Sequence, residues 1–109
     1  MFKQGDIVKV SLDPNQGHKQ KGYRAVLIIQ NNLLSQAIQS TTVILPISSS
    51  KTSMPFEVEL PKSLKTTGKV LCRRIRALDL STRKCKYVES VPKEIPDDCL
   101  DNVTKIISK

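Results

Sequence analysis

Residues 5–29 read GDIVKVSLDPNQGHKQKGYRAVLII, and this stretch decides the fold. In its first part Val8, Val10 and Leu12 alternate with polar residues, which predicts a strand with one buried face over residues 6–12. In its last part four apolar residues follow one another at 26–29, a run typical of a strand covered on both sides, predicted over 24–30. The polar loop between the two strands holds His18, the only histidine of the chain. Long loops in compact domains are where functional residues concentrate, so we expect a site here.

The rest of the chain continues as short apolar runs separated by turn residues. We predict four more strands, over residues 41–47, 55–60, 69–76 and 83–89. A short helix is predicted at Leu33–Ile38, and a terminal helix where apolar residues recur at helical spacing, with Asp97 and Asp98 in its first turn. A chain of 109 residues predicts a single domain, residues 1–109, and the elements place it in the mainly β class.

The composition favours a polyanionic partner. Lys and Arg outnumber Asp and Glu by 18 to 10, which gives a formal net charge of +8. Each phosphate that a basic surface neutralises releases condensed counterions, and this favours binding to nucleic acid. The same charge also suits an acidic protein partner.

The three cysteines, Cys72, Cys85 and Cys99, are irregularly spaced. An odd number of cysteines with no signal peptide predicts reduced thiols in a cytoplasmic protein. No Cys or His residues have the spacing of zinc ligands, and no cluster of carboxylates suggests a two-metal site, so we expect no metal and no cofactor. No apolar run approaches the length that spans a membrane, so we expect no membrane association.

Three motifs follow one another along the chain. The first runs from Gly5-Asp6-Ile7-Val8 through Leu12-Asp13-Pro14 and Gly17-His18 to Gly22-Tyr23-Arg24, the second is Val43-Ile44-Leu45-Pro46-Ile47-Ser48-Ser49, and the third extends from Thr67-Gly68 to Arg76-Ala77-Leu78-Asp79. Together they cover nearly the whole chain, which resembles the MazF/PemK/Kid toxins, small bacterial endoribonucleases of toxin–antitoxin pairs. The resemblance implies a small, bent SH3-like antiparallel barrel with short helices and a C-terminal helix, the CcdB/MazF-like plasmid-maintenance toxin fold.

The resemblance also implies an activity and partners. Toxins of this family cleave single-stranded RNA at specific sequences without a metal and leave a 2′,3′-cyclic phosphate and a 5′-hydroxyl. A cognate acidic antitoxin neutralises them, and they form homodimers whose RNA groove crosses the subunit interface. We therefore expect single-stranded RNA, an acidic antitoxin and a second copy of the chain as partners.

Three residues are the expected catalytic groups. Arg24 matches the family's catalytic arginine, and its planar guanidinium suits a bidentate phosphate contact. Ser48 matches the active-site threonine, and His18 matches a histidine of the Kid branch and is the natural proton carrier. A single histidine excludes a two-histidine mechanism within one subunit, so arginine must act electrostatically or as the acid. Each residue also has a plainer interpretation: Arg24 as a strand cap or a partner of Asp13, Ser48 as a loop residue and His18 as a solvated side chain.

The remaining candidates are expected to contact RNA: Lys19, Gln20, Lys21, Ser49, Arg73, Arg74 and Arg76. Three positions depart from the Kid branch. Lys19 and Arg73 stand where acidic residues are common, the second of them the proposed general base, and Leu71 replaces an arginine. The acid–base roles of that branch therefore do not carry over, and activity would depend on Arg24 with Ser48. We interpret Arg76 and Asp79 as a structural ion pair.

Two other functions remain open on the same barrel. One is a catalytically weakened RNA- or DNA-binding module, which Arg73 and Arg74 suggest. The other is a protein-binding module, since fold does not fix function. The chain has only two Tyr, two Phe and no Trp, which disfavours both the recognition of proline-rich peptides and extensive base stacking.

Overall fold

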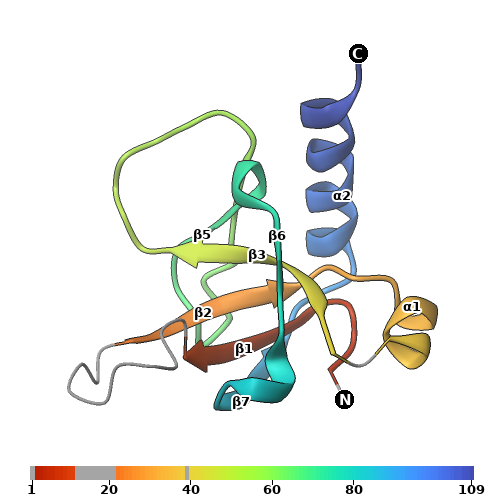
Figure 1. The fold of residues 1–109 in the computed structure, drawn as a ribbon. Coiled ribbons are helices and arrows are strands. Elements are labelled where there is room, and N and C mark those ends of the chain that lie inside the picture. Colours follow the sequence, from red (N-terminus) through yellow and green to blue (C-terminus); the bar gives the residue numbers. More distant parts are fainter. Residues whose placement is uncertain (1, 12–21, 39) are drawn as a thin grey trace.

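The computed structural model describes residues 2–11, 22–38 and 40–109. Figure 1 shows strands at the centre, a short helix at one end and a long C-terminal helix beside them. In chain order the elements are β1 (Asp6–Ser11), β2 (Tyr23–Ile28), α1 (Asn32–Ala37), β3 (Thr42–Ser48), β4 (Glu57–Glu59), β5 (Lys69–Leu71), the 3₁₀ turn η2 (Cys72–Arg74), β6 (Arg76–Leu78), the 3₁₀ turn η3 (Leu80–Thr82), β7 (Cys85–Ser90) and α2 (Glu94–Ile107). Among these elements no helix is long and apolar enough to cross a membrane.

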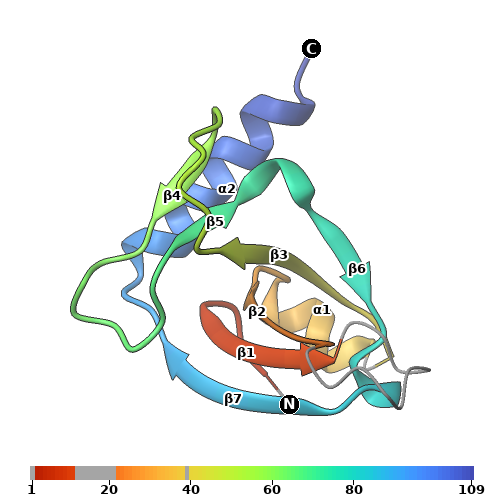
Figure 2. The ribbon, with the colours of Figure 1, turned by 90° about the vertical axis from the view of Figure 1, so that its left-hand side faces the viewer.

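The strands form one antiparallel sheet in the order β4-β5-β3-β2-β1-β7, and β6 pairs with β3 beside this path. The sheet bends strongly at β3, whose first part pairs with β2 and β6 and whose last two residues pair with β5 (Figure 2). Pro46 is the last β3 residue paired with β2, and it has no N–H with which to continue that ladder. The fold is thus the bent antiparallel sheet with a C-terminal helix that the sequence predicts, although the sheet does not close.

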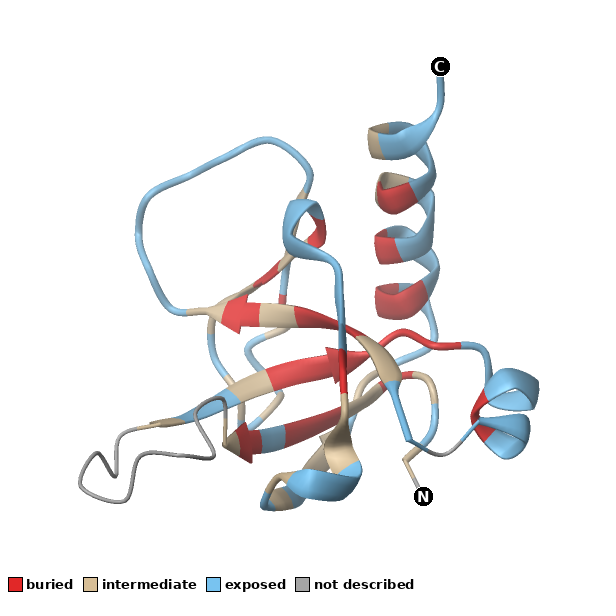
Figure 3. Cartoon of the chain, in the orientation of Figure 1, coloured by how far each residue is buried: buried red, intermediate tan, exposed pale blue. Residues whose placement is uncertain are grey.

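Both faces of the sheet are buried. One core contains Ile7, Leu27 and Leu45, which pack with Ile95, Cys99 and Val103 from α2. The other core contains Val8, Val10, Val26, Ile28, Ile44 and Leu78. Consecutive residues of β2 enter alternate cores, as strand geometry requires, which confirms that the apolar run is covered on both sides (Figure 3). Each fully buried aliphatic side chain in these cores contributes about 1.5–3 kcal/mol through the hydrophobic effect.

Two predicted strands have wrong boundaries. The segment 69–76 is two strands separated by η2, because the backbone leaves the extended conformation at Cys72, whose side chain is buried. The predicted strand 55–60 is shorter, since Phe56 adopts a positive φ of 62° in a turn. Helix α2 begins at Glu94 and has Asp97 in its first turn, as predicted, together with Glu94 in place of Asp98. Pro96 is accommodated in the same turn, where its missing N–H needs no partner in the helix.

Candidate functional site

Arg24 and Ser48 lie on the same face of the sheet. The last pair of the β2–β3 register is Val26 with Pro46, and Arg24 and Ser48 each lie two residues beyond it. Side chains two residues apart on a strand share a face, so Arg24 lies on the face of Val26, and Ser48 on the face of Pro46. The two ends separate here because Ser48 pairs with Lys69 of β5. Arg24 is exposed, so its guanidinium is open to a ligand.

Ser48 opens into a pocket of about 550 Å³. The lining side chains come from β3, the loop that follows it, β4, β5 and η2: Ser48, Ser50, Thr52, Met54, Glu57, Lys69, Leu71, Arg73 and Arg74. The Ser48 hydroxyl accepts a hydrogen bond of 3.0 Å from the Ser50 backbone N–H. Its own proton remains available for donation to an anion.

Gly68 allows β5 to approach the Ser48 backbone. A Cβ atom built at Gly68 would lie 2.3 Å from the Ser48 carbonyl oxygen, and the residue has φ of +121°. Residues that carry a side chain rarely adopt such a φ. The Gly68 carbonyl also accepts a hydrogen bond of 2.9 Å from the Leu60 N–H, so this glycine joins β4 to the site strand.

An ion pair lies inside the same pocket. The Lys69 Nζ is 3.0 Å from the Glu57 Oε1, and the two side chains are only 15% and 12% exposed. Glu57 also accepts a hydrogen bond of 3.1 Å from the Met54 N–H, and Lys69 donates to the Thr52 carbonyl. The Met54 hydrogen bond, Lys69 and the charge of Arg73 lower the pKa of Glu57, so it is an anion at neutral pH. The pair therefore fastens the loop between β3 and β4 to β5.

The arginines of the third motif are all exposed. Arg73 and Arg74 of η2 line the Ser48 pocket. Arg76 pairs with Ile44 and shares the face of Leu78. Its partner Ile44 precedes Ser48 by four residues on β3, which corresponds to about 13 Å at 3.3 Å per residue.

Asp79 does not serve as the ion partner of Arg76. Its carboxylate accepts hydrogen bonds of 3.0 Å and 2.5 Å from the backbone and hydroxyl of Ser81, and it caps η3. The hydrogen bond from the Ser81 side chain lowers the pKa of Asp79, with smaller contributions from backbone N–H groups and Arg83. Among the residues with described positions, the ion pairs are Lys69–Glu57, Lys93–Asp97 and Lys105–Asp101. The predicted Arg76–Asp79 pair is therefore corrected to a helix cap.

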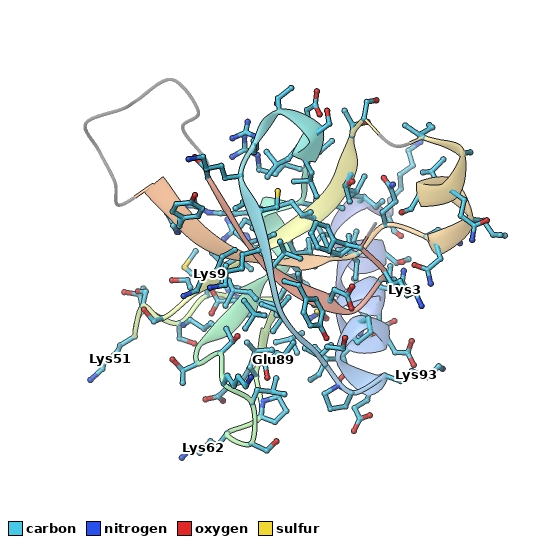
Figure 4. All side chains as sticks on the ribbon, turned by 90° about the horizontal axis from the view of Figure 1, so that it is seen from below. Lys3, Lys9, Lys51, Lys62, Glu89 and Lys93 are labelled. Carbon is cyan, nitrogen blue, oxygen red and sulfur yellow. The ribbon has the colours of Figure 1, made fainter. Side chains whose placement is uncertain are left out.

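Ser49 lines a second, neighbouring pocket of about 800 Å³. This pocket shares the Glu57–Lys69 pair with the first and is also lined by Lys51 and Lys62, whose side chains Figure 4 shows extending outward. The ion pair thus stands between two adjoining pockets. His18, Lys19, Gln20 and Lys21 lie outside the described residues.

The buried cysteines are structural. Cys72 and Cys99 are both free and both belong to the core beneath α2. The hydrogen bond with Cys72 and burial raise the pKa of the Cys99 thiol. Within the described ranges no group of three or more His, Cys, Asp or Glu side chains could hold a metal ion.

Sequence reasoning missed the Glu57–Lys69 pair. In the predicted strand 55–60, Glu57 alternates with Phe56 and Val58, and this pattern places it on the outer face as a solvated carboxylate. The signal that could have identified it is Lys69 beside Gly68 in the third motif, since the glycine draws β5 against the loop after Ser48.

Comparison with known proteins gives one consistent result. Residues 3–107 match the family described as PemK-like, MazF-like toxin of type II toxin–antitoxin system. The chain is 33% identical over 111 residues to the endoribonuclease PemK of Escherichia coli, covering 98% of this chain and 83% of the relative. It is 34% identical over 102 residues to the endoribonuclease MazF of Staphylococcus saprophyticus, covering 89% and 84%.

A solved structure agrees at the level of the fold. The MazE–MazF structure (Form II) from Deinococcus radiodurans superposes with a TM-score of 0.83 at 20% sequence identity, covering 98% of this chain and 95% of that chain. At this identity the likeness establishes the bent sheet and its C-terminal helix.

Proposed function

This chain belongs to the PemK-like, MazF-like toxin family of type II toxin–antitoxin systems, and from that premise we propose that it is an endoribonuclease toxin that cleaves single-stranded RNA at specific sequences. The names of its relatives support this class of reaction. The observation that carries the proposal is the placement of Ser48 in one pocket with Lys69, Arg73 and Arg74. Arg24 supports it, because this exposed residue lies on the Ser48 face of the sheet, two residues beyond the last β2–β3 pair. Such an array of cations suits a phosphodiester substrate.

In the proposed reaction the 2′-hydroxyl of one ribose gives its proton to solvent water, and its oxygen attacks the adjacent phosphorus. The bond from phosphorus to the 5′-oxygen breaks, so the products carry a 2′,3′-cyclic phosphate and a 5′-hydroxyl, and no metal is needed. The Arg24 guanidinium binds the non-bridging oxygens, on which negative charge develops in the transition state. Ser48 donates its hydroxyl proton in a hydrogen bond to one of these oxygens, and His18 supplies the proton to the departing oxygen.

The test is incubation of the protein with a long single-stranded RNA in EDTA, followed by analysis of the fragment ends. We expect cleavage with cyclic-phosphate and 5′-hydroxyl ends. Arg24→Ala should lower the rate by about 100-fold or more, because it removes transition-state stabilisation. Ser48→Ala should cost less and His18→Ala less again, and Lys105→Ala on α2 is the control for loss of one charge.

Two outcomes would reject the proposal. Cleavage that EDTA abolishes would exclude the metal-free mechanism. RNA that stays intact while the folded protein binds it would favour the nucleic-acid-binding module, for which Arg73 in place of a carboxylate is the supporting feature.

We also propose three properties that family membership supports. A cognate acidic antitoxin neutralises the toxin by covering its basic surface. Two copies form a homodimer whose RNA groove crosses the interface. The protein acts in the cytoplasm, where messenger RNA is found. Light scattering on the purified chain tests the dimer, and a monomer at micromolar concentration would contradict it.

A further inference from the structure

Two lysines face each other directly on the sheet. The β1–β7 register pairs Lys9 with Lys86. Directly opposite residues of an antiparallel pair have Cβ atoms roughly 4.5–5.5 Å apart, and like charges in these positions destabilise the sheet. None of the three ion pairs found in the described part of the chain involves either lysine. Among the residues with described positions, no carboxylate forms an ion pair with either of these two like charges.

Protection of the sheet edge explains only one of the two lysines. Strand β7 is the last strand of the sheet, and lysine on an edge strand discourages pairing with other chains. Strand β1 lies between β2 and β7, so Lys9 protects no edge. Figure 4 shows Lys9 extending from the sheet as an exposed side chain. Its exposed ammonium group can therefore bind an anion from outside the described part of the chain.

The two lysines line a pocket of about 320 Å³ with Lys84, Tyr23 and Cys85. We call this the Lys9 pocket. The Tyr23 side chain is 46% exposed, and its partner Ser11 lies two residues from Lys9, so the ring shares the lysine face. No carboxylate from residues 2–11, 22–38 or 40–109 lines the pocket. Ammonium groups beside an exposed aromatic ring are the combination that binds single-stranded nucleic acid, with phosphates on the cations and a base stacked on the ring.

We propose that the Lys9 pocket binds the phosphodiester backbone of single-stranded RNA, and that Tyr23 stacks on a base outside the segment being cleaved. The choice of RNA as the ligand rests on the proposed function. Tyr23 and Arg24 are adjacent in β2 and lie on opposite faces, so this pocket is separate from the Arg24 and Ser48 face. It extends the length of RNA that the protein holds.

The experiment measures binding without cleavage. A 2′-O-methyl RNA of about 20 nucleotides lacks the attacking hydroxyl, and its affinity is followed by fluorescence anisotropy over a range of salt concentrations. Lys9→Thr or Lys86→Thr should reduce the log–log salt slope by about 0.7 for each lost contact. Tyr23→Leu should weaken binding about fivefold or more by removal of stacking.

The lysine variants also carry a signature that a structural role would not give. Each should raise the thermal midpoint in low salt, because removing one charge relieves the Lys9–Lys86 repulsion. Lys9→Arg should keep the RNA affinity, and Lys105→Ala, which removes a charge already paired with Asp101 on α2, should leave the salt slope unchanged.

Several outcomes separate this inference from the proposed function. Unchanged affinity and salt slope in both lysine variants would overturn it, even if the wild type cleaves RNA. If the lysine variants lost affinity for polyglutamate but kept the wild-type affinity for RNA, the inference would also be overturned, in favour of an acidic protein ligand. A wild type that binds the 2′-O-methyl RNA through these lysines but cleaves no RNA would support the pocket and reject the ribonuclease.

Discussion

At the scale of single residues, Gly68 controls how closely β5 approaches Ser48, the proposed catalytic serine. Gly68→Ala would place a Cβ atom 2.3 Å from the Ser48 carbonyl oxygen at a φ of +121°. We expect a loss of stability of about 1–3 kcal/mol, since both the contact and the backbone conformation are unfavourable. Urea unfolding measures it. Gly22→Ala, whose nearest contact is 4.0 Å away and whose φ is ordinary, is the matched control, and equal effects of the two would contradict this role.

Arg73 is the residue at which the chain departs most informatively from the Kid branch. It shares a pocket with Ser48 and is exposed, so we expect it to contact a phosphate. Arg73→Gln should reduce the log–log salt slope of RNA binding by about 0.7 and leave the single-turnover rate on bound RNA nearly unchanged. Arg73→Asp is the discriminating variant. If this substitution accelerated cleavage, Arg73 would instead be blocking the position of a general base.

At the scale of elements, the Glu57–Lys69 pair joins β4, β5 and the loop after Ser48. Glu57→Ala removes the acceptor of the Met54 N–H and the partner of Lys69, so the Met54 amide should exchange faster with solvent and KM for RNA should rise more than kcat falls. Hydrogen exchange gives a readout that does not depend on activity. Asp101→Ala breaks an ion pair whose side chains are 60% and 66% exposed and should leave both quantities unchanged. Glu57→Asp should restore part of the protection.

Glu89 fastens the loop before β5 to β7 and gives the fold an acid limit. Burial alone would raise the pKa of Glu89. Hydrogen bonds from the Lys65 N–H, the Thr66 hydroxyl and the Thr66 N–H together outweigh this effect, so the net shift is downward from 4.5. A depressed pKa in the folded state contributes stability above the unfolded pKa, and this is lost as pH falls through the folded value. We therefore expect the thermal midpoint of unfolding to decrease as the pH is lowered below about 4.5, and we expect this decrease to be smaller in Glu89→Gln. An identical pH profile for the variant would assign the acid limit to other carboxylates.

The elements also show what the sequence could and could not predict. The run at 26–29 specified a strand buried on both faces, because local hydrophobicity alone decides that. The break of 69–76 at Cys72 was not visible, since Cys72 turns inward to pack under α2, which is a long-range contact. Arg24 and Ser48 were proposed through motif resemblance alone, because no local pattern relates two residues on different strands, and strand alternation in the structure places them on one face. Lys69 was missed because its meaning depends on Glu57, which precedes it by twelve positions.

At the scale of the whole molecule, charge links the two partners that we propose. The net charge of +8 includes exposed cations on both sides of β2, in the Ser48 pocket and in the Lys9 pocket. A disordered acidic segment can cover such a surface at modest affinity per unit area, and long-range attraction accelerates its association. An antitoxin that neutralises this charge should therefore exclude RNA.

We predict that the cognate antitoxin segment competes with RNA for the toxin. Saturating antitoxin should release a labelled 2′-O-methyl RNA, and the association rate of the antitoxin should fall steeply as ionic strength rises, because screening shortens the reach of the +8 charge. Stopped-flow anisotropy measures both quantities. A segment with the same composition in scrambled order separates specific binding from charge alone. Inhibition by occlusion would have to be abandoned if the antitoxin bound tightly while RNA affinity stayed the same, since the two ligands would then occupy different surfaces.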